Sequence, residues 1–240
     1  IYFKKMKKKI ALVCCRGGSK GIKKKNIKLF NGKPLLHWTY KNIENSKIFD
    51  HIFLSTDDYN IAKLGKRLGF SVPQIRPKKL ALDYSDVFDT HKFFFKKNKI
   101  NDTNSLVCIV NNNPFISSSI LKKTFKKFKI SNFKFITMCA LKIEKEQIFF
   151  RQTKIVNNKL FPIFKNDLIK SKINRQSSID YYYNTGDLRW GKPSDLDNYK
   201  KFNRIICKNG FKFIMIDKKK YQDLNNLNDW KVGEKKFKLL

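Results

Sequence analysis

The sequence is short of acidic residues and of arginine. It has 53 Lys and Arg residues against 19 Asp and Glu residues, for a formal net charge of +34, and only seven of the 53 are Arg. Such a charge is typical of proteins that bind nucleic acid. The lysines, however, are spread along the whole chain among abundant Asn, Ile and Phe, as codon usage rich in A and T produces. We interpret most of them as solvated. A polyanion-binding surface is the alternative, and some non-specific nucleic-acid binding is expected at low salt.

Long apolar runs and paired cysteine motifs are also missing. No apolar run reaches the roughly 18 residues that can span a membrane, and the charged N-terminus has no hydrophobic segment typical of a signal peptide. The five cysteines are an odd number without a CxxC motif, which favours a reducing cytoplasm over a disulfide scaffold. His37, His51 and His91 show no metal-ligand spacing and are interpreted as structural. Neither a membrane nor a specific nucleic acid is therefore expected as a partner.

The 240 residues suit one α/β domain. Met6 directly precedes the first apolar strand pattern, so residues 1–5 are expected to be a disordered extension and 6–240 a single domain. Residues 143–192 contain extended, aromatic-rich stretches without a clean helix pattern. We expect an insertion or arm there.

Strand and helix patterns alternate over most of the chain. Strands are predicted at 10–15, 51–55, 71–75, 106–110, 133–141 and 211–216. Helices are predicted at 34–46, 58–68, 85–97, 117–128, 194–203 and 226–237. Pro34 suits a first helical turn, Ser85 an N-cap and Gly69 a C-terminal stop. This order predicts βαβ units and a mostly parallel sheet of Rossmann-like type.

The stretch CCRGGSKGIKKKN, residues 14–26, follows the first predicted strand. In an open α/β sheet, ligands bind beyond the carboxyl ends of the strands. Gly17, Gly18 and Gly21 allow close backbone approach, while Arg16 and Lys25 offer charge to phosphate oxygens. The spacing is neither that of a Walker loop nor that of a dinucleotide fingerprint. The loop is therefore a candidate phosphate cradle, with a flexible turn as the alternative.

Read as a whole, the string RGGSKGIxxKN resembles the signature of the acylneuraminate cytidylyltransferase family, the CMP-sialic acid synthetases. The resemblance extends over nearly the whole chain from Met6. Further motifs that resemble the family are Gly32-Lys33-Pro34-Leu35, Phe49-Asp50, Ser55-Thr56-Asp57-Asp58, Ile61-Ala62, Val72-Pro73, Arg76-Pro77, Leu80-Ala81, Asp83, Asp229-Trp230-Lys231 and Glu234.

Two further stretches resemble the pseudaminic acid branch of the family. Cys108-Ile109 with Pro114-Phe115 is similar to CIYPTAPF, and 181–191 is similar to YHDAGQFYWG. The resemblance implies a nucleotide-diphospho-sugar transferase fold and a homodimer whose contact involves 143–192. It implies a reaction in which CTP and a nonulosonic acid, here pseudaminic acid, give a CMP-sugar and pyrophosphate. That product would serve surface glycan or flagellin glycosylation.

The same resemblance assigns candidate site residues. The catalytic residues are expected to be Arg16, Lys25 and Asp223. The nucleotide-binding residues are expected to be Arg16, Gly17, Gly18, Ser19, Lys20, Lys25, Asn26, Asp83, Asn112 and Asn113. The sugar-binding residues are expected to be Asn113, Pro114, Asn184 and Gly186. Mg²⁺ is expected as the cofactor, held by Asp223 and Asn225. Asp57 and Asp58 are candidates either for the site or for a helix start.

The sequence departs from the family pattern at several of these positions. The family's Asp-x-Asp is Asp223-Leu224-Asn225, its PTAP is 111–114 with three Asn, and its Asp-Ala-Gly-Gln is 184–187 with Asn first and Asp last. Cys14 and Cys15 replace its Pro and Ala. Asn225 brings no charge, so weaker metal affinity is expected.

Four hypotheses follow. The first is a pseudaminic acid cytidylyltransferase. The second is an enzyme for N-acetylneuraminic or legionaminic acid. The third is a catalytically weak homologue that still binds nucleotide. The fourth, motivated by charge alone, is a polyanion-binding protein.

Overall fold

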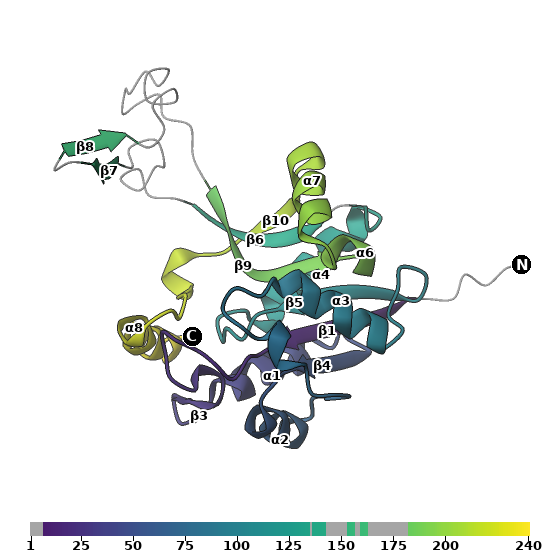
Figure 1. Ribbon diagram of the computed structural model, residues 1–240, viewed down its shortest axis with the longest axis horizontal. Coiled ribbons are helices and arrows are strands. Elements are labelled where there is room, and N and C mark those ends of the chain that lie inside the picture. Colours follow the sequence, from purple (N-terminus) through teal and green to yellow (C-terminus); the bar gives the residue numbers. More distant parts are fainter. Residues whose placement is uncertain (1–6, 135, 143–152, 157–158, 163–181) are drawn as a thin grey trace, which may run out of the picture.

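The computed structural model describes residues 7–134, 136–142, 153–156, 159–162 and 182–240 (Figure 1). A six-stranded sheet with the order β10-β6-β9-β5-β1-β4 organises these residues. Its strands are β1 Lys8–Cys14, β4 His51–Ser55, β5 Ser105–Val110, β6 Thr137–Lys142, β9 Tyr182–Gly191 and β10 Lys212–Met215.

The sheet is mostly parallel, as the alternating strand and helix patterns predict. Strand β1 pairs parallel with both β4 and β5, and β10 pairs parallel with β6. Strand β9 runs antiparallel between β5 and β6, with Val110 opposite Leu188 and Ala140 opposite Asn184. Residues 182–191 are therefore a central strand of the sheet, whereas most of the rest of the insertion expected at 143–192 lies outside the described residues.

Helices cover both faces of the sheet (Figure 1). They are α1 Leu35–Ser46, α2 Tyr59–Leu68, α3 Val87–Lys97, α4 Ser118–Ile130, α6 Pro193–Leu196, α7 Tyr199–Asn209 and α8 Leu227–Phe237. Short 3-10 turns occur at η1 Lys25–Ile27, η2 Lys78–Leu80 and η5 Lys218–Lys220. Two small hairpins pair β2 Leu29–Phe30 with β3 Lys33–Pro34, and β7 Thr153–Val156 with β8 Lys159–Pro162.

Alternate side chains of β1 build the two cores. Ala11 and Val13 face a core that includes buried residues of α1, α4 and α8, whereas Ile10 and Leu12 face a core that includes residues of α3 and α7. A strand buried on both faces reads as a continuous apolar run. This explains why β1 is recognisable from the sequence.

The core on the α1 side is rich in aromatic contacts. Trp190 of β9 is fully buried and stacks on Phe49 with ring centroids 5.3 Å apart. Phe30 of β2 packs edge-on against Trp230 of α8, and Asn31 hydrogen-bonds Glu234. These contacts hold α8 beside the hairpin that follows the glycine-rich loop.

Some predicted elements differ from the observed ones. The strand predicted at 71–75 is present only as two isolated parallel bridges, Phe53 to Ser71 and Thr56 to Ile75. The strand predicted at 133–141 begins at Thr137. The helix predicted at 194–203 is divided into α6 and α7, because Asn198 caps a new helix at Tyr199.

Two predicted helix starts also shift. Asp86, not Ser85, caps α3 by accepting a hydrogen bond from the Phe88 amide, while the Ser85 hydroxyl donates to the Lys79 carbonyl. Asp and Ser are about equally good N-caps, and here the Ser85 hydroxyl is engaged with Lys79 while Asp86 takes the cap. Pro34 lies one residue before α1, at its N-cap position.

All five cysteines are free thiols, with Cys15, Cys108 and Cys139 buried and Cys207 exposed. His91 is buried and its Nδ1 lies 2.9 Å from the Leu196 carbonyl oxygen, as expected of a structural histidine. Within the described ranges, no helix combines the length and apolar character needed to cross a membrane.

Candidate active site

A cavity of about 480 Å³ opens at the carboxyl ends of β1 and β5, beside the N-terminal half of β9. The loops after β1 and β5, the segment 76–90, β9 and the residues before α8 all contribute to its wall. The polar lining residues are Arg16, Ser19, Lys25, Asn26, Arg76, Asp83, Ser85, Thr90, Asn111, Asn112, Asn113, Thr185, Asp187, Asp223 and Asn225. The cavity therefore lies where the fold and the glycine-rich loop predict a ligand.

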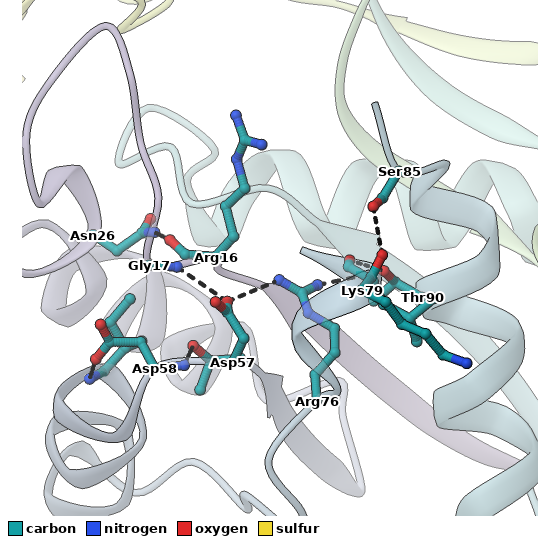
Figure 2. Close-up of polar contacts among 12 residues, drawn as sticks. Arg16, Gly17, Asn26, Asp57, Asp58, Arg76, Lys79, Ser85 and Thr90 are labelled. Atoms are coloured by element: carbon teal, nitrogen blue, oxygen red, sulfur yellow. Dashed lines mark hydrogen bonds and ion pairs between the residues drawn. The ribbon is translucent and has the colours of Figure 1, made fainter. Parts of the chain in front are cut away.

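The start of the glycine-rich loop is tied to the sheet through Asp57 (Figure 2). The Asp57 carboxylate accepts a hydrogen bond from the Gly17 amide at 3.1 Å and pairs with Arg76 at 3.4 Å. The Asn26 side chain donates to the Arg16 carbonyl at 2.9 Å. Asp58 instead caps α2 by accepting from two backbone amides. The two acidic residues thus have different roles: Asp57 positions the loop, and Asp58 starts a helix.

At two glycines of the loop, neighbouring atoms leave no room for a side chain. A Cβ at Gly21 would lie 2.0 Å from the Asn225 carbonyl oxygen, and one at Gly17 would lie 2.8 Å from an Asp58 carboxylate oxygen. Real Cβ atoms do not approach other atoms so closely. Gly18 has open space around its Cα. The loop therefore packs directly against the chain that carries Asp223 and Asn225.

Two cations of the loop line the cavity, and a third pairs with a lining residue. Arg16 and Lys25 line the wall. Arg16 pairs with Asp83 at 2.7 Å, and the mostly exposed Lys20 pairs with the same carboxylate at 2.6 Å. The Lys20 hydrogen bond, followed by that of Arg16, lowers the pKa of Asp83. Asp83 thus holds both cations in place at the cavity mouth.

The three asparagines after β5 form a hydrogen-bonded floor. The buried Asn112 accepts from the Thr39 hydroxyl at 2.7 Å and donates to the Asn26 side chain at 2.9 Å. Asn113 donates to Asp187 at 3.3 Å, and its side-chain oxygen accepts from the Phe115 amide. These amides join the glycine-rich loop, the β5 loop and β9 into one framework.

Asp187 is a buried carboxylate in the cavity wall, with 4% of its surface exposed. It accepts hydrogen bonds from the Tyr221 hydroxyl and from Asn113. Burial raises its pKa, and the nearby Asp223 charge raises it further. The antiparallel direction of β9 places this residue beside the carboxyl end of β5, next to Asn111.

Asp223 and Asn225 lie on the wall formed by the chain before α8. The Asn225 amide donates to the Asp223 carboxylate at 2.9 Å, and its backbone amide donates to Asp229. Across the described parts of the chain, no group of three or more His, Cys, Asp or Glu side chains is arranged to hold a metal ion. A cation here would need further ligands from a bound substrate, as Mg²⁺ commonly takes from phosphates.

Arg76 is a wall residue to which the sequence reasoning gave no role. Only 5% of its surface is exposed, and its guanidinium contacts Asp57 and, at 3.5 Å, the Thr90 hydroxyl. Its Nε atom is buried without a hydrogen-bond partner among the described residues. Arginine is rare in this lysine-rich chain, so an arginine within a motif is a signal that could have identified it.

Cys14, the last residue of β1, also lines the cavity. Burial raises the pKa of its thiol to about 11. A neutral thiol is a poor nucleophile, so Cys14 acts as a small wall residue.

Comparison with known proteins agrees with this geometry. Residues 10–182 match a family model described as cytidylyltransferase. The chain is a member of the cytidylyltransferase family. It is 35% identical over 133 residues to the pseudaminic acid cytidylyltransferase of Campylobacter jejuni subsp. jejuni serotype O:23/36 (strain 81-176), covering 54% of this chain and 56% of that protein.

Other relatives support the family and the fold. An N-acylneuraminate cytidylyltransferase of Oncorhynchus mykiss is 41% identical over 88 residues, or 37% of this chain and 20% of that protein. The solved structure of CMP:2-keto-3-deoxy-manno-octonic acid synthetase complexed with CTP has a TM-score of 0.72 at 12% identity, covering 97% of this chain and 99% of that one. The chain thus spans little more than half the length of the first of these curated relatives and a smaller part of the second.

In this member of the family, nine of the residues expected from the sequence line the cavity together. They are Arg16, Ser19, Lys25, Asn26, Asp83, Asn112, Asn113, Asp223 and Asn225. Gly17, Gly18 and Lys20 belong to the same loop but lie outside the lining.

Three expected sugar-binding residues lie outside the lining. The Pro114 carbonyl accepts a hydrogen bond from Asn42, and the Gly186 carbonyl accepts one from Asn111. Asn184 is exposed on β9. In their place, Thr185 and Asp187 of the same strand face the cavity.

Proposed function

We propose that this cytidylyltransferase converts CTP and a nonulosonic acid, pseudaminic acid foremost, to the CMP-sugar and pyrophosphate. One observation carries the proposal: Arg16 and Lys25 of the glycine-rich loop and the carboxylate of Asp223 line one cavity. A triphosphate needs cations and amides around its oxygens. The pseudaminic acid relative supports the choice of sugar.

The loop side of the cavity would bind the triphosphate. Arg16 and Lys25 would neutralise its charge, and Ser19 and the loop amides would donate to its oxygens. Because Asp83 already holds Arg16, an incoming phosphate would exchange one anionic partner of that arginine for another. The sugar hydroxyl would attack the α-phosphorus and release its proton to solvent, while the bond to the bridging oxygen breaks and pyrophosphate leaves with the electron pair. Positioning and charge stabilisation supply most of such catalysis.

The segment that includes Arg76, Ser85 and Thr90 would take the cytosine. It combines hydroxyl groups and a buried guanidinium with the apolar side chains of Leu82 and Val87. A planar base with carbonyl and amino groups needs this mixture of hydrogen-bonding groups and apolar walls.

The oxygen donors of the opposite wall fit Mg²⁺, which prefers carboxylates, phosphates and water. Asp223, with the Asn225 carbonyl, is the expected holder. When bound, the ion would neutralise charge on the triphosphate. The protein's own residues keep Asp223 oriented, because the Asn225 amide donates to it.

A binding-only homologue is a second candidate, favoured by the neutral Asn225 at the expected metal position. It would bind CTP without turnover. N-acetylneuraminic and legionaminic acids are alternative sugars for an active enzyme.

The test is pyrophosphate release with CTP and Mg²⁺ in parallel reactions with pseudaminic, legionaminic and N-acetylneuraminic acids. We expect release with pseudaminic acid. Lys25→Met should abolish it, whereas Lys23→Met, an exposed lysine of the same loop, should not. CTP binding without release in any reaction would support the binding-only homologue, and release with another acid would change the proposed sugar.

We also propose a cytoplasmic homodimer, as the free cysteines and the family resemblance imply. The expected contact region 143–192 lies largely outside the described residues. Light scattering after size-exclusion chromatography should give twice the 28.5 kDa chain mass. A mass of one chain at all concentrations would reject the dimer.

A further inference from the structure

A second cavity, separate from the candidate active site, lies where α6 contacts α3 and α7 (Figure 1). Its volume of about 510 Å³ is close to the 480 Å³ of the first cavity, and the two linings share no residue. The lining residues are Lys92, Ser194, Asp197, Asn198, Lys200, Lys201 and Arg204. All seven are polar, so this cavity suits a hydrophilic ligand and not an apolar one.

The lining of this second cavity is strongly positive. Four of its residues are cations and one, Asp197, is a carboxylate, which leaves a net charge of +3. Lys92 comes from α3, and the other cations come from α7. Lys92, Lys200 and Arg204 form no ion pair with another residue that the structure describes. A cleft lined mainly by one sign of charge concentrates the electric field and attracts ions of the opposite sign.

Hydrogen bonds around Ser194 fix one wall of the cavity. The Ser194 amide and hydroxyl both donate to the Asp102 carboxylate, at 2.9 Å and 2.7 Å. The Lys201 ammonium donates to the Ser194 carbonyl at 2.6 Å and to its hydroxyl oxygen at 2.9 Å, and it lies 3.5 Å from Asp195. Lys201 is therefore held in the wall with part of its charge offset. The other three cations are the ones that can turn to a ligand.

The lysine-rich composition supplies its own comparison for this cavity. On α3, the exposed Lys96 lies one turn after Lys92, and on α7 the exposed Lys208 lies one turn after Arg204. Neither Lys96 nor Lys208 lines the cavity. If composition alone placed the lining cations, these neighbours would contribute as much to the binding of an anion. A site at the cavity instead requires that only the lining residues matter.

The chemistry of the lining favours phosphate groups. Guanidinium and ammonium groups pair well with phosphate oxygens. A net charge of +3 matches a ligand with several negative charges better than it matches a single carboxylate. The lining contains no aromatic side chain on which a nucleobase could stack. A compact anion is therefore favoured over a nucleic acid.

We propose that this cavity binds a small anion with two or more phosphate groups, of which pyrophosphate is the simplest, through Lys92, Lys200 and Arg204. The inference goes beyond the proposed function, because none of these residues lines the candidate active site. Free oligophosphates and phosphorylated metabolites present the same groups. Pyrophosphate and fructose 1,6-bisphosphate are the probes that distinguish these two sources.

The test is calorimetric titration of the protein with each probe. Saturating CTP, without metal or sugar acid, occupies the candidate active site, and about 0.15 M salt screens non-specific attraction. We expect at least one of the two probes to bind, and the tighter one to identify the source. The double variant Lys92→Met with Arg204→Met should weaken that binding by about tenfold or more. No binding of either probe to the wild type would overturn the inference.

The matched control is the double variant Lys96→Met with Lys208→Met. It removes the same two charges from the same two helices, outside the cavity. Its affinity for the probe should stay within about twofold of the wild type, because exposed charges at a distance are screened. Equal weakening in the two double variants would mean that net charge alone attracts the anion, and the inference would fail.

Single-stranded RNA, titrated against the same proteins, tests the macromolecular alternative. We expect the two double variants to bind RNA equally, because RNA contacts the lysines of the whole surface. RNA binding that depends on Lys92 and Arg204, with no binding of either small probe, would assign the cavity to a nucleic-acid surface instead. The comparison of variants does not depend on CTP binding, so failure of the proposed function leaves this inference testable.

A second measurement needs no variant. Acetic anhydride acetylates accessible lysines of the wild-type protein, and mass spectrometry gives the rate at each position. We expect pyrophosphate or fructose 1,6-bisphosphate, added with saturating CTP, to slow acetylation of Lys92 and Lys200 but not of Lys96 and Lys208. Equal protection of all four lysines, or of none, would overturn the inference whether or not the variants fold.

Discussion

The carboxylate of Asp57 links the glycine-rich loop to the buried guanidinium of Arg76. Its carboxylate receives the Gly17 amide from one side and Arg76 from the other. The Arg76 side chain is 5% exposed and that of Asp57 is 17% exposed. Removing one partner of such a pair leaves an uncompensated buried charge, which costs far more than the pair itself contributes.

We therefore expect Arg76→Met to destabilise the protein by about 3 kcal/mol. Urea denaturation measures the change. Arg67→Met, on the exposed surface of α2, is the matched control and should change stability by less than about 0.5 kcal/mol. Adding Asp57→Asn to Arg76→Met should cost less than the sum of the two single changes, because the double variant has no unpaired charge. Strict additivity would show that the two side chains do not depend on each other.

Because His91 is buried, we expect the free energy of unfolding to fall in acid. Burial is the main cause that lowers its pKa from 6.5 to about 4. The unfolded chain binds a proton at higher pH than the folded chain does. The contribution of His91 to the free energy of unfolding is therefore complete above the pKa of the unfolded chain. It decreases by about 3 kcal/mol in all as the pH falls from about 6.5 towards 4.

The measurement is urea unfolding at about pH 7 and about pH 4, with His91→Gln for comparison. Glutamine keeps a donor for the Leu196 carbonyl but cannot take up a proton. The wild type should lose about 3 kcal/mol more than the variant over this range. Equal losses in the two proteins would mean that another group causes the acid sensitivity.

Site residues could be predicted from the sequence where they lie together in one short motif. Arg16, Lys25 and Asn26 lie within one short motif after a strand, so their type and spacing sufficed. Asp187 was not recognised because its place depends on which strands flank β9, and no local pattern contains that information. Arg76 was recognised only as part of a motif, because its role depends on burial beside Asp57.

At the scale of elements, the glycine-rich loop and the segment before α8 are in direct contact. The Gly21 position has no room for a side chain, since the Asn225 carbonyl lies 2.0 Å from where a Cβ would be. A backbone carbonyl cannot move aside as the end of a flexible side chain can. The distance between the two walls of the cavity is thus fixed at this glycine.

Gly21→Ala should separate these walls and weaken CTP binding by about tenfold or more, since small misplacements of binding groups are costly. Calorimetric titration with CTP measures this. Gly18→Ala, at an open position, should leave the free energy of unfolding within about 0.5 kcal/mol of the wild type. Wild-type CTP affinity in Gly21→Ala would show that the two segments need not touch.

The elements themselves were predictable to different degrees. Strands buried on both faces, such as β1 and β5, have continuous apolar sequences and were recognised. Strand β9 begins with exposed tyrosines and contains Asn184 and Asp187, so it resembles a loop or arm. The bridges at Ser71 and Ile75 are too short to form a strand, although their sequence has an extended pattern.

The molecule as a whole is strongly positive, although the cavity itself is not lined mainly by cations. The net charge is +34, whereas the cavity lining contains both cations and carboxylates. Surface lysines interact with polyanions mainly through the release of counterions, which salt suppresses.

We expect single-stranded RNA to bind at low salt and to lose about a thousandfold in affinity between about 50 mM and about 200 mM salt. Fluorescence anisotropy with labelled RNA measures this. Saturating CTP should not displace the RNA. Binding that persists at the higher salt and is displaced by CTP would instead favour a polyanion-binding function at the cavity.

The position of β9 also has a consequence for biosynthesis. The ribosome produces β1, β4, β5 and β6 well before residues 182–191, yet β9 is the strand that joins β5 to β6. Until it emerges, the edges of β5 and β6 that β9 covers stay unpaired, and unpaired strand edges are templates for wrong pairing. A nascent chain that stops before residue 191 therefore cannot complete its sheet. We expect such chains to depend on chaperones, and the protein to acquire its native structure only late in translation.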